Sequence, residues 1–250
     1  MKTLEVLFSP PEFAMLQRRD LSETVCVVFD ILRATTSMMM ALSNGADGII
    51  PVSEISEAVA LREKNPDTLL AGERDGLRIR AEQTGSVDFD FGNSPREFPA
   101  EKVHGKTIAM TTTNGTRALQ ACAGAKTILI GSFLNLRPLA NWIIEKQPTQ
   151  LILVCSGTNE QAALEDTLAA GALCEKIWVH YVGGNVADSA EIARRIYPLM
   201  QMDLIGAMNH SQNGRRLLAN PLLRSDVGFC LQRETLNFIA ECRDGVVRKL

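Results

Sequence analysis

Hydrophobic positions along the chain fall into short apolar runs that alternate with longer amphipathic ones. The short runs end at Gly, Pro, Asn or Ser and predict strands, while apolar residues at helical spacing predict helices. The predicted strands are 3–8, 25–29, 48–52, 107–110, 128–130 and 150–155, and residues 227–231 have the composition of a further short strand. The predicted helices are 36–43, 53–65, 111–122, 161–179 and 187–200. This order predicts an α/β fold, a layered α/β/α arrangement with a largely parallel or mixed sheet.

One of the predicted strands and one repeat refine this picture. Residues 25–29 are apolar at every position, so this strand is expected to be covered on both faces. Gly45 and Ser53 enclose an apolar run, as do Gly124 and Ser132, with a separation of eight in both copies. A tandem βαβ duplication explains this repeat, and so does the general likeness of βαβ units. We expect one domain over residues 1–250, with two similar halves that can share one cleft.

Composition and charge narrow the class of protein. The 250 residues include 26 Lys and Arg against 29 Asp and Glu, a net charge of −3, so there is no general basic field for nucleic acid. No apolar run has membrane length, and residues 1–16 lack the apolar core of a signal peptide, so a cytoplasmic location is expected. The six cysteines form no C-x-x-C pair and are expected to be reduced core thiols. The sequence is also compatible with a homo-oligomer.

Candidate chemistry begins where the strand 25–29 ends. Asp30 follows that strand, with Arg33 next and Thr35 opening a helix-like segment. In open α/β sheets ligands bind at the carboxyl ends of strands, where helix N-termini attract anions. The segment therefore predicts an anion site beside a metal ligand. The alternative is that Asp30 and Thr35 only cap the helix.

Two further strand ends carry similar side chains. Glu73 and Arg74 lie at the end of an apolar run, although a charged tight turn would have the same composition. The segment before the predicted helix 111–122 is rich in hydroxyl groups and suits a phosphate or carboxylate. Its candidate ligand-binding residues are Thr112, Thr113, Asn114, Gly115, Thr116 and Arg117. Arg33, Arg74 and Arg117 together suggest a ligand with more than one anionic group.

Two other segments contribute candidates. Residues 88–91 alternate acids with Phe, so they form an edge strand, or the turn after them folds over a ligand with Asn93 and Ser94 as donors. Glu165 and Asp166 are adjacent in a helix otherwise made of small and apolar residues. Adjacent helical positions point about 100° apart, so we expect at most one of the two acids in solvent and the other facing inward. An inward acid is a hard oxygen ligand suited to Mg²⁺.

Several familiar motifs are absent. There is no G-x-x-x-x-G-K-[ST], no G-x-G-x-x-G and no G-x-S-x-G. His104, His180 and His210 are far apart in sequence and far from the acidic clusters, which disfavours zinc hydrolysis and a histidine nucleophile. A cysteine-dependent phosphatase needs Cys, five residues and then Arg, whereas counting in this way from Cys155 reaches Gln161.

The combined motifs resemble those of the 2-phosphosulfolactate phosphatase family, in the family's order from about residue 4 to about residue 230. The residues that carry the resemblance are 28–36, 41–46, 70–74, 91–95, 111–119, 130–135 and 164–171. The resemblance implies an α/β fold unlike the common phosphatase folds. It also implies a Mg²⁺-dependent phosphatase that converts 2-phospho-3-sulfolactate to 3-sulfolactate, a step of coenzyme M synthesis.

In the mechanism this suggests, Asp30, Glu73 and Asp166 hold Mg²⁺ against the phosphate and Glu165 or Asp30 orients water. Arg33 and Arg117 balance charge in the transition state. In a variant mechanism Asp30 is the nucleophile and an aspartyl phosphate forms. The family commonly has a basic residue after the Cys-x-Gly turn, whereas this chain has Thr158, Asn159 and Glu160. Two alternatives therefore remain: the protein acts on another small anionic phosphoester, or it only binds or senses anions without catalysis.

Overall fold

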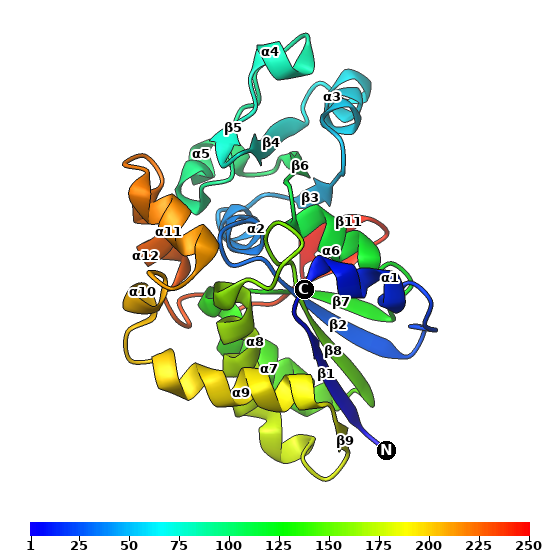
Figure 1. Cartoon of the computed structure of the whole chain (residues 1–250). Coiled ribbons are helices and arrows are strands. Elements are labelled where there is room, and N and C mark those ends of the chain that lie inside the picture. The colour runs from blue at the N-terminus through cyan, green and yellow to red at the C-terminus, as the bar shows by residue number, and fades with distance from the viewer.

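The computed structural model describes Met1 to Leu250 and contains one sheet of eleven strands (Figure 1). The strands are β1 (Thr3–Leu7), β2 (Thr24–Phe29), β3 (Gly48–Pro51), β4 (Leu69–Arg74), β5 (Leu77–Arg78), β6 (Thr107–Thr111), β7 (Thr127–Gly131), β8 (Gln150–Cys155), β9 (Asn185–Val186), β10 (Ala240–Arg243) and β11 (Val246–Lys249). Their order in space is β5-β4-β6-β3-β11-β10-β7-β2-β8-β1-β9. Pairing is antiparallel only at β5 and around the β10–β11 hairpin. The predicted α/β class with a mainly parallel, mixed sheet is confirmed.

Helices cover this sheet and connect its strands. The α-helices are α1 (Phe13–Leu16), α2 (Ala34–Ser43), α3 (Ile55–Lys64), α4 (Ala81–Thr84), α5 (Ala100–Val103), α6 (Gly115–Ala121), α7 (Leu136–Lys146), α8 (Leu164–Ile177), α9 (Asp188–Met200), α10 (Leu204–Ala207), α11 (Gln212–Ala219) and α12 (Arg224–Cys230). Four 3-10 turns are η1 (Pro10–Glu12), η2 (Pro95–Glu97), η3 (Phe133–Asn135) and η4 (Trp178–His180). None of these helices combines the length and apolar character that a membrane span requires.

The sequence repeat corresponds to a repeat in the sheet. Two three-stranded blocks, β4-β6-β3 and β8-β2-β7, flank the β10–β11 hairpin in equivalent order from outside to inside. The chain runs from β2 through α2 to β3 in the other block, and from β6 through α6 back to β7. The two copies of the repeated segment thus pass through β3 and β7, the strands that adjoin the hairpin on its two sides.

Helices α2 and α6 are the elements that join the two blocks. Buried residues of both helices, including Met38, Met39 and Leu119, belong to one hydrophobic cluster with residues from both blocks, such as Ile108 and Val154. This interior position explains why nearly every residue of α2 is buried, including its hydroxyl-bearing first turn. The crossing of α2 and α6 brings the loops after β2 and β6 to the same place.

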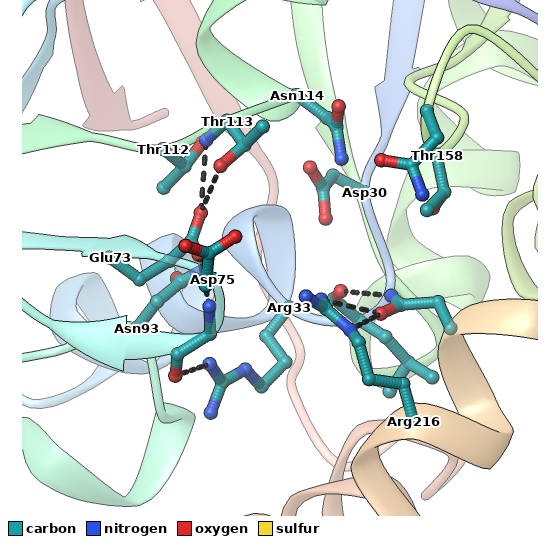
Figure 2. A pocket seen from close by; sticks show the side chains of 14 residues that line it. Asp30, Arg33, Glu73, Asp75, Asn93, Thr112, Thr113, Asn114, Thr158 and Arg216 are labelled. Atoms are coloured by element: carbon teal, nitrogen blue, oxygen red, sulfur yellow. Dashed lines mark hydrogen bonds between the residues drawn. The ribbon is translucent and has the colours of Figure 1, made fainter.

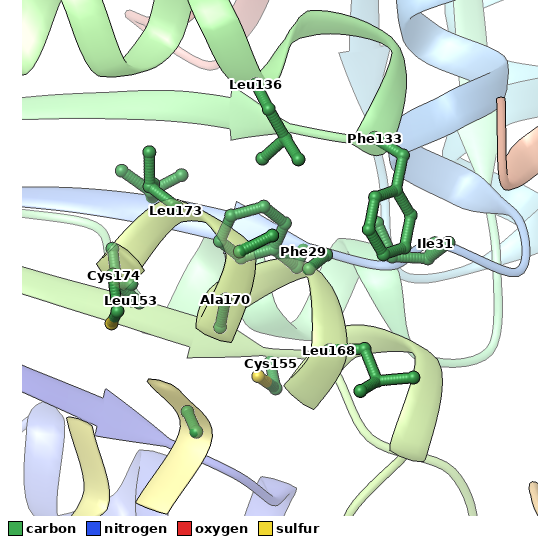
Figure 3. Packing of buried hydrophobic residues seen from close by; sticks show 14 of the residues in the cluster. Phe29, Ile31, Phe133, Leu136, Leu153, Cys155, Leu168, Ala170, Leu173 and Cys174 are labelled. Carbon is green, nitrogen blue, oxygen red and sulfur yellow. The ribbon is translucent and has the colours of Figure 1, made fainter. Parts of the chain in front are cut away.

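Strand β2 is buried along its whole length, as its apolar sequence predicts. Val25, Val27 and Phe29 pack on one face with residues of α7 and α8, where Figure 3 shows Phe29 beside Ala170 and Leu173. Cys26 and Val28 belong to the cluster on the other face. Coverage on both faces fixes the position of the residues that follow β2.

Two features of the C-terminal part differ from the sequence prediction or were not predicted. The predicted strand 227–231 is wrong, because these residues lie in α12 and just after it. Val227, Cys230 and Leu231 are buried at helical spacing, which a short apolar run cannot distinguish from a strand. The β10–β11 hairpin was not predicted. Its turn is Asp244-Gly245, with φ of 52° and 74°, a pair typical of two-residue hairpins.

Two smaller predictions are resolved by burial. Phe89 and Phe91 are 1% and 4% exposed, and residues 88–91 form a loop beside β4 with one bridge from Phe91 to Ala71, so they are not an edge strand. All six cysteines are unpaired and all but Cys242 are buried, which confirms reduced thiols.

Candidate active site

A polar pocket of about 70 Å³ lies where the loops after β2, β4, β6 and β8 meet, as predicted for strand ends (Figure 2). Leu32 is the only hydrophobic residue among the fourteen that line it. The others are Asp30, Arg33, Glu73, Asp75, Gly76, Asn93, Thr112, Thr113, Asn114, Thr158, Asn159, Asn213 and Arg216. A wall of this kind favours a small, polar, charged ligand over an apolar one.

Asp30 occupies the end of β2 and is 8% exposed. Its Oδ1 accepts a hydrogen bond from the backbone N–H of Ala34 at 3.1 Å, whereas its Oδ2 accepts none from the protein. The Thr35 hydroxyl bonds the backbone N–H and carbonyl of Asp30 at 3.0 and 2.9 Å. Asp30 therefore does cap α2, as the alternative interpretation held, and it also presents one carboxylate oxygen to the pocket.

The surroundings of Asp30 favour its neutral form. Burial raises the pKa of Asp30 to about 7, with Glu73 and Glu165 as further raising charges and Arg33 and the Ala34 N–H as lowering influences. An acid of this kind changes its charge near neutral pH. Asp30 is thus able to hold or accept a proton near neutral pH.

Gly115 is required for the close approach of α6 to Asp30. A Cβ atom at this position would lie 2.7 Å from the Ala34 Cβ and 2.8 Å from the Asp30 Oδ2. We therefore expect Gly115→Ala to displace Asp30 or the start of α6, and to lower at least tenfold the kcat of the phosphatase activity that the family resemblance implies. Gly183→Ala is the matched control, because no atom lies within 4 Å of the added Cβ there. Equal kcat values for both variants would contradict this role of Gly115.

Glu73 holds the opposite wall of the pocket together. Its Oε1 accepts hydrogen bonds from the N–H and hydroxyl of Thr113 at 3.0 and 2.9 Å, and its Oε2 accepts the Gly76 N–H at 2.7 Å. Asp75 and Gly76 form the two-residue turn of the β4–β5 hairpin with φ of 56° and 81°. The segment is therefore both a tight turn and a strand end, which the sequence left as alternatives. Both donors of Thr113 are bonded to Glu73.

Arg33 lines the pocket but is committed to a buried network. Its Nη1 contacts the Asp226 Oδ2 at 2.6 Å and its Nη2 donates to the Gly76 carbonyl at 2.8 Å. Asp226 is completely buried, and its Oδ1 also accepts from Ser94 Oγ at 2.7 Å and Arg96 Nε at 2.8 Å. Arg33 and Ser94 thus stabilise the pocket wall, and the sequence offered no signal for Asp226.

Glu165 and Asp166 are both buried, which agrees with the expectation that at most one of them is in solvent. Helix α8 lies inside the fold, which leaves no exposed side at its first turn. Asp166 accepts the backbone N–H groups of Ile31 at 2.8 Å and Gly157 at 3.1 Å, joining the loops after β2 and β8. Burial, together with Asp30 and Glu165, raises the pKa of Asp166 well above its usual value. Neither acid lines the pocket.

Five other candidates lie outside the lining. The Thr116 hydroxyl donates to the Thr112 carbonyl at 3.0 Å, Thr35 is engaged by Asp30, and Gly115 packs against Asp30. Arg74 donates to the Glu73 carbonyl at 2.7 Å and to Thr111 Oγ1 at 3.1 Å. Arg117 is exposed and forms an ion pair with Glu160 at 2.5 Å, which lowers the pKa of Glu160. These residues shape the pocket or its surroundings and do not face into it.

Two candidates do offer free polar atoms to the pocket. Asn93 Oδ1 and Thr112 Oγ1 are buried and have no hydrogen-bond partner. An unpaired buried oxygen costs free energy unless a ligand or water satisfies it. Asn93 is therefore positioned by the turn after Phe91 in the way that the ligand-binding alternative predicted.

Of the three acids that the sequence predicts as magnesium ligands, only two line the pocket. No group of three His, Cys, Asp or Glu side chains in the structure is arranged to hold a metal. Asp30 and Glu73 line the pocket with Asp75, whereas Asp166 has both oxygens bonded to backbone N–H groups outside it. Mg²⁺ commonly uses one or two carboxylates and completes its shell with water and substrate phosphate. Asp30 presents one free carboxylate oxygen to the lining, and Asn93 and Thr112 each add an unpaired oxygen elsewhere in it, which are oxygen ligands of the kind that such an ion uses.

The chain matches the family described as 2-phosphosulpholactate phosphatase over residues 13–245. It belongs to this family. A relative from Caldanaerobacter subterraneus subsp. tengcongensis, described as a probable 2-phosphosulfolactate phosphatase, is 38% identical over 232 residues, 92% of each chain. Relatives with the same description are 36% identical in Caldicellulosiruptor saccharolyticus, over 92% of this chain and 93% of theirs, and in Thermotoga maritima, over 88% and 89%. The predicted family is confirmed.

In this 2-phosphosulfolactate phosphatase family member, sequence reasoning missed several residues of the pocket. Asp75 had a signal, because Asp-Gly after a strand is typical of a hairpin turn. Asn213 and Arg216 come from α11, far along the chain from the strand ends, and nothing in their local pattern connects them to the pocket. Their contribution depends on how α11 packs against the loop after β2, where Asn213 Nδ2 donates to the Leu32 carbonyl at 2.8 Å.

Proposed function

We propose that this protein is a Mg²⁺-dependent phosphatase that hydrolyses 2-phospho-3-sulfolactate to 3-sulfolactate and phosphate. The observation that carries the proposal is the convergence of four strand-end loops on one small polar pocket with Asp30 at its base, in a chain of this family. The substrate combines phosphate, sulfonate and carboxylate groups on three carbons, so it is small and strongly charged, like the pocket lining.

The charge of the pocket supports a requirement for a divalent cation. Asp30, Glu73 and Asp75 bring three carboxyl groups to the lining, against Arg33 and Arg216. Arg33 is already paired with Asp226, so Glu73 and Asp75 oppose only Arg216, and ionised Asp30 adds a further negative charge that repels a phosphoester. A cation held by Asp30 would reverse this repulsion, because metal ions are often the largest local charges in a site.

Different residues would have different roles in the proposed hydrolysis. When bound, Mg²⁺ would neutralise phosphate charge and favour attack at phosphorus. Asp30 would orient the attacking water and accept its proton through the carboxylate oxygen that it presents to the pocket. Asn114, at the start of α6, would donate to phosphate oxygens. Asp166 and Glu165 would keep the loop after β2 and helix α11 in place.

The test is phosphate release from 2-phospho-3-sulfolactate compared with 2-phospholactate and 2-phosphoglycerate, with Mg²⁺ and with EDTA. We expect the highest kcat/KM for 2-phospho-3-sulfolactate and loss of turnover in EDTA that added Mg²⁺ restores. A higher kcat/KM for another ester would overturn the assignment of 2-phospho-3-sulfolactate as the substrate. Tight binding of all three esters without phosphate release would indicate an anion-binding protein. Asp67→Asn is a control variant, because Asp67 is an exposed acid paired with Lys106.

Asp30 as the nucleophile is the competing route. In that route the Asp30 carboxylate attacks phosphorus, the alcohol leaves, and water then hydrolyses the aspartyl phosphate. Rapid-quench labelling distinguishes the two, because only this route gives an acid-stable phosphoprotein that hydroxylamine cleaves.

A further inference from the structure

The pocket holds one guanidinium group that no carboxylate neutralises. Arg33 pairs with Asp226, and Arg117 pairs with Glu160 outside the lining. Arg216 also lines the pocket, is exposed, and has no ion-pair partner. A cation left unpaired beside several carboxylates is suited to receive an anionic group of a ligand.

A buried chain of hydrogen bonds fixes the position of Arg216. Asn213 Oδ1 accepts from both Nε and Nη2 of Arg216, at 3.2 and 2.8 Å. The Asn213 amide is itself oriented, because its Nδ2 donates to the Leu32 carbonyl and to Glu165 Oε1 at 3.2 Å. Ser211 Oγ holds the other oxygen of Glu165 at 2.5 Å. This arrangement uses one edge of the guanidinium and leaves its Nη1 without a partner.

The place of Arg216 in the pocket separates it from the proposed phosphate position. In Figure 2, Asn114 and Arg216 lie on opposite sides of Asp30, and Arg216 reaches in from α11. The phosphate is assigned to the side of Asp30 and Asn114 under the proposed function. A group attached to the same small carbon frame would then extend toward α11.

We propose that Arg216 is a specificity-determining residue that binds the second anionic group of the substrate, its sulfonate or carboxylate. This inference rests on the proposed function and adds the residue that selects a doubly anionic phosphoester over a simple one. Glu165 and Asn213 act as positioning residues, because their hydrogen bonds hold the guanidinium in an orientation fit for an oxyanion.

The experiment compares Arg216→Gln with wild type on three esters in the presence of Mg²⁺. Ethyl phosphate has no second anionic group, 2-phospholactate adds a carboxylate, and 2-sulfoethyl phosphate adds a sulfonate. We expect Arg216→Gln to lower kcat/KM about 10- to 100-fold for the ester whose second group Arg216 binds. Its kcat/KM for ethyl phosphate should stay within about threefold of wild type. The ester that loses most identifies the group.

Two controls keep the result specific. Arg215→Gln alters the neighbouring arginine, which donates to the Asn209 carbonyl at 3.3 Å and does not line the pocket, so all three kcat/KM values should be unchanged. Arg216→Lys should recover only part of the selectivity, because Lys lacks the planar fork of Arg. An equal fall for all three esters in Arg216→Gln, or no fall for any, would overturn the proposal.

A binding measurement separates this inference from the function itself. Calorimetry with 3-sulfolactate, which has the sulfonate and carboxylate but no phosphate, should give a Kd about tenfold weaker or more for Arg216→Gln than for wild type. If wild type releases phosphate from no ester, the proposed function fails while this comparison still tests Arg216. Equal Kd values would count against Arg216 even if the enzyme is active.

Discussion

Replacing Asp30 by Asn is expected to lower phosphate release at least 1,000-fold and, in the same protein, to increase its stability at neutral pH. Activity falls because the variant loses both the proposed ligand for Mg²⁺ and the proton acceptor. Stability rises because the carboxylate is buried beside Glu73 and Glu165. The amide keeps an oxygen that can accept the Ala34 N–H, so α2 retains its cap.

The pH dependence of this gain follows from the raised pKa. The pKa of Asp30 is about 7 in the folded protein against an ordinary value of 3.8, so the folded state binds more protons between these values. Stability of the wild type therefore decreases as pH rises from about 4 to about 7, and Asn removes this loss. We expect the variant to be more stable by about 2–4 kcal/mol at pH 8 and equal to wild type near pH 4.

Urea unfolding in EDTA across that pH range measures the difference without metal. A gain in the free energy of unfolding that is the same at pH 4 and pH 8 would show that Asp30 is not the titrating group. Asp67→Asn provides the comparison for an exposed acid, and its effect should be within about 0.5 kcal/mol at every pH.

Asp226→Ala is expected to be the most destabilising single substitution near the pocket. Asp226 is completely buried and is the one carboxylate that pairs with Arg33, whose side chain is 3% exposed. Removing it leaves a buried guanidinium without a counter-charge, which costs about 3–5 kcal/mol. Ser94 and Arg96 lose their acceptor as well, so the pocket wall should loosen and phosphate release should fall.

The double variant Arg33→Met, Asp226→Leu tests the physical reason. With both charges gone, no buried ion is left unpaired, and much of the free energy of unfolding should return. Activity should not return, because the wall formed by Arg33 and Gly76 is still altered. If the double variant is as unstable as Asp226→Ala in urea unfolding, packing and not charge explains the loss.

The sequence was sufficient for those parts of the fold that depend on local pattern. Strand β8 has the predicted bounds, and β2 has the coverage that its unbroken apolar run indicates. The prediction at 227–231 fails because a run of that length fits a helix turn as well as a strand. The β10–β11 hairpin had a local signal in Asp244-Gly245, but its central place in the sheet depends on pairing with β3 and β7, which no local pattern encodes.

The candidate site was predictable to the same extent. Asp30 and Asn114 lie just after strands and Glu73 lies near the end of β4, and topology alone brings strand ends together. Side-chain direction was not predictable, because Arg74 lies between the pocket residues Glu73 and Asp75 and yet makes its hydrogen bonds elsewhere. Asp166 is buried but bonds backbone N–H groups outside the pocket. Asp226 and Arg216 belong to helices late in the chain. The role of Asp226 depends on its tertiary contact with Arg33, and that of Arg216 on the contact of Asn213 with Leu32.

The central position of β10 and β11 sets the order in which a nascent polypeptide can assemble. Residues 240–249 leave the ribosome after every strand that they separate, and the two blocks share no direct strand pairing without them. Each block can form early, but the seam between them closes only when synthesis has passed this hairpin. Until β10 and β11 have been synthesised, β3 and β7 are therefore unpaired apolar edges. A chaperone that covers these two strands during that interval would prevent strand exchange between molecules.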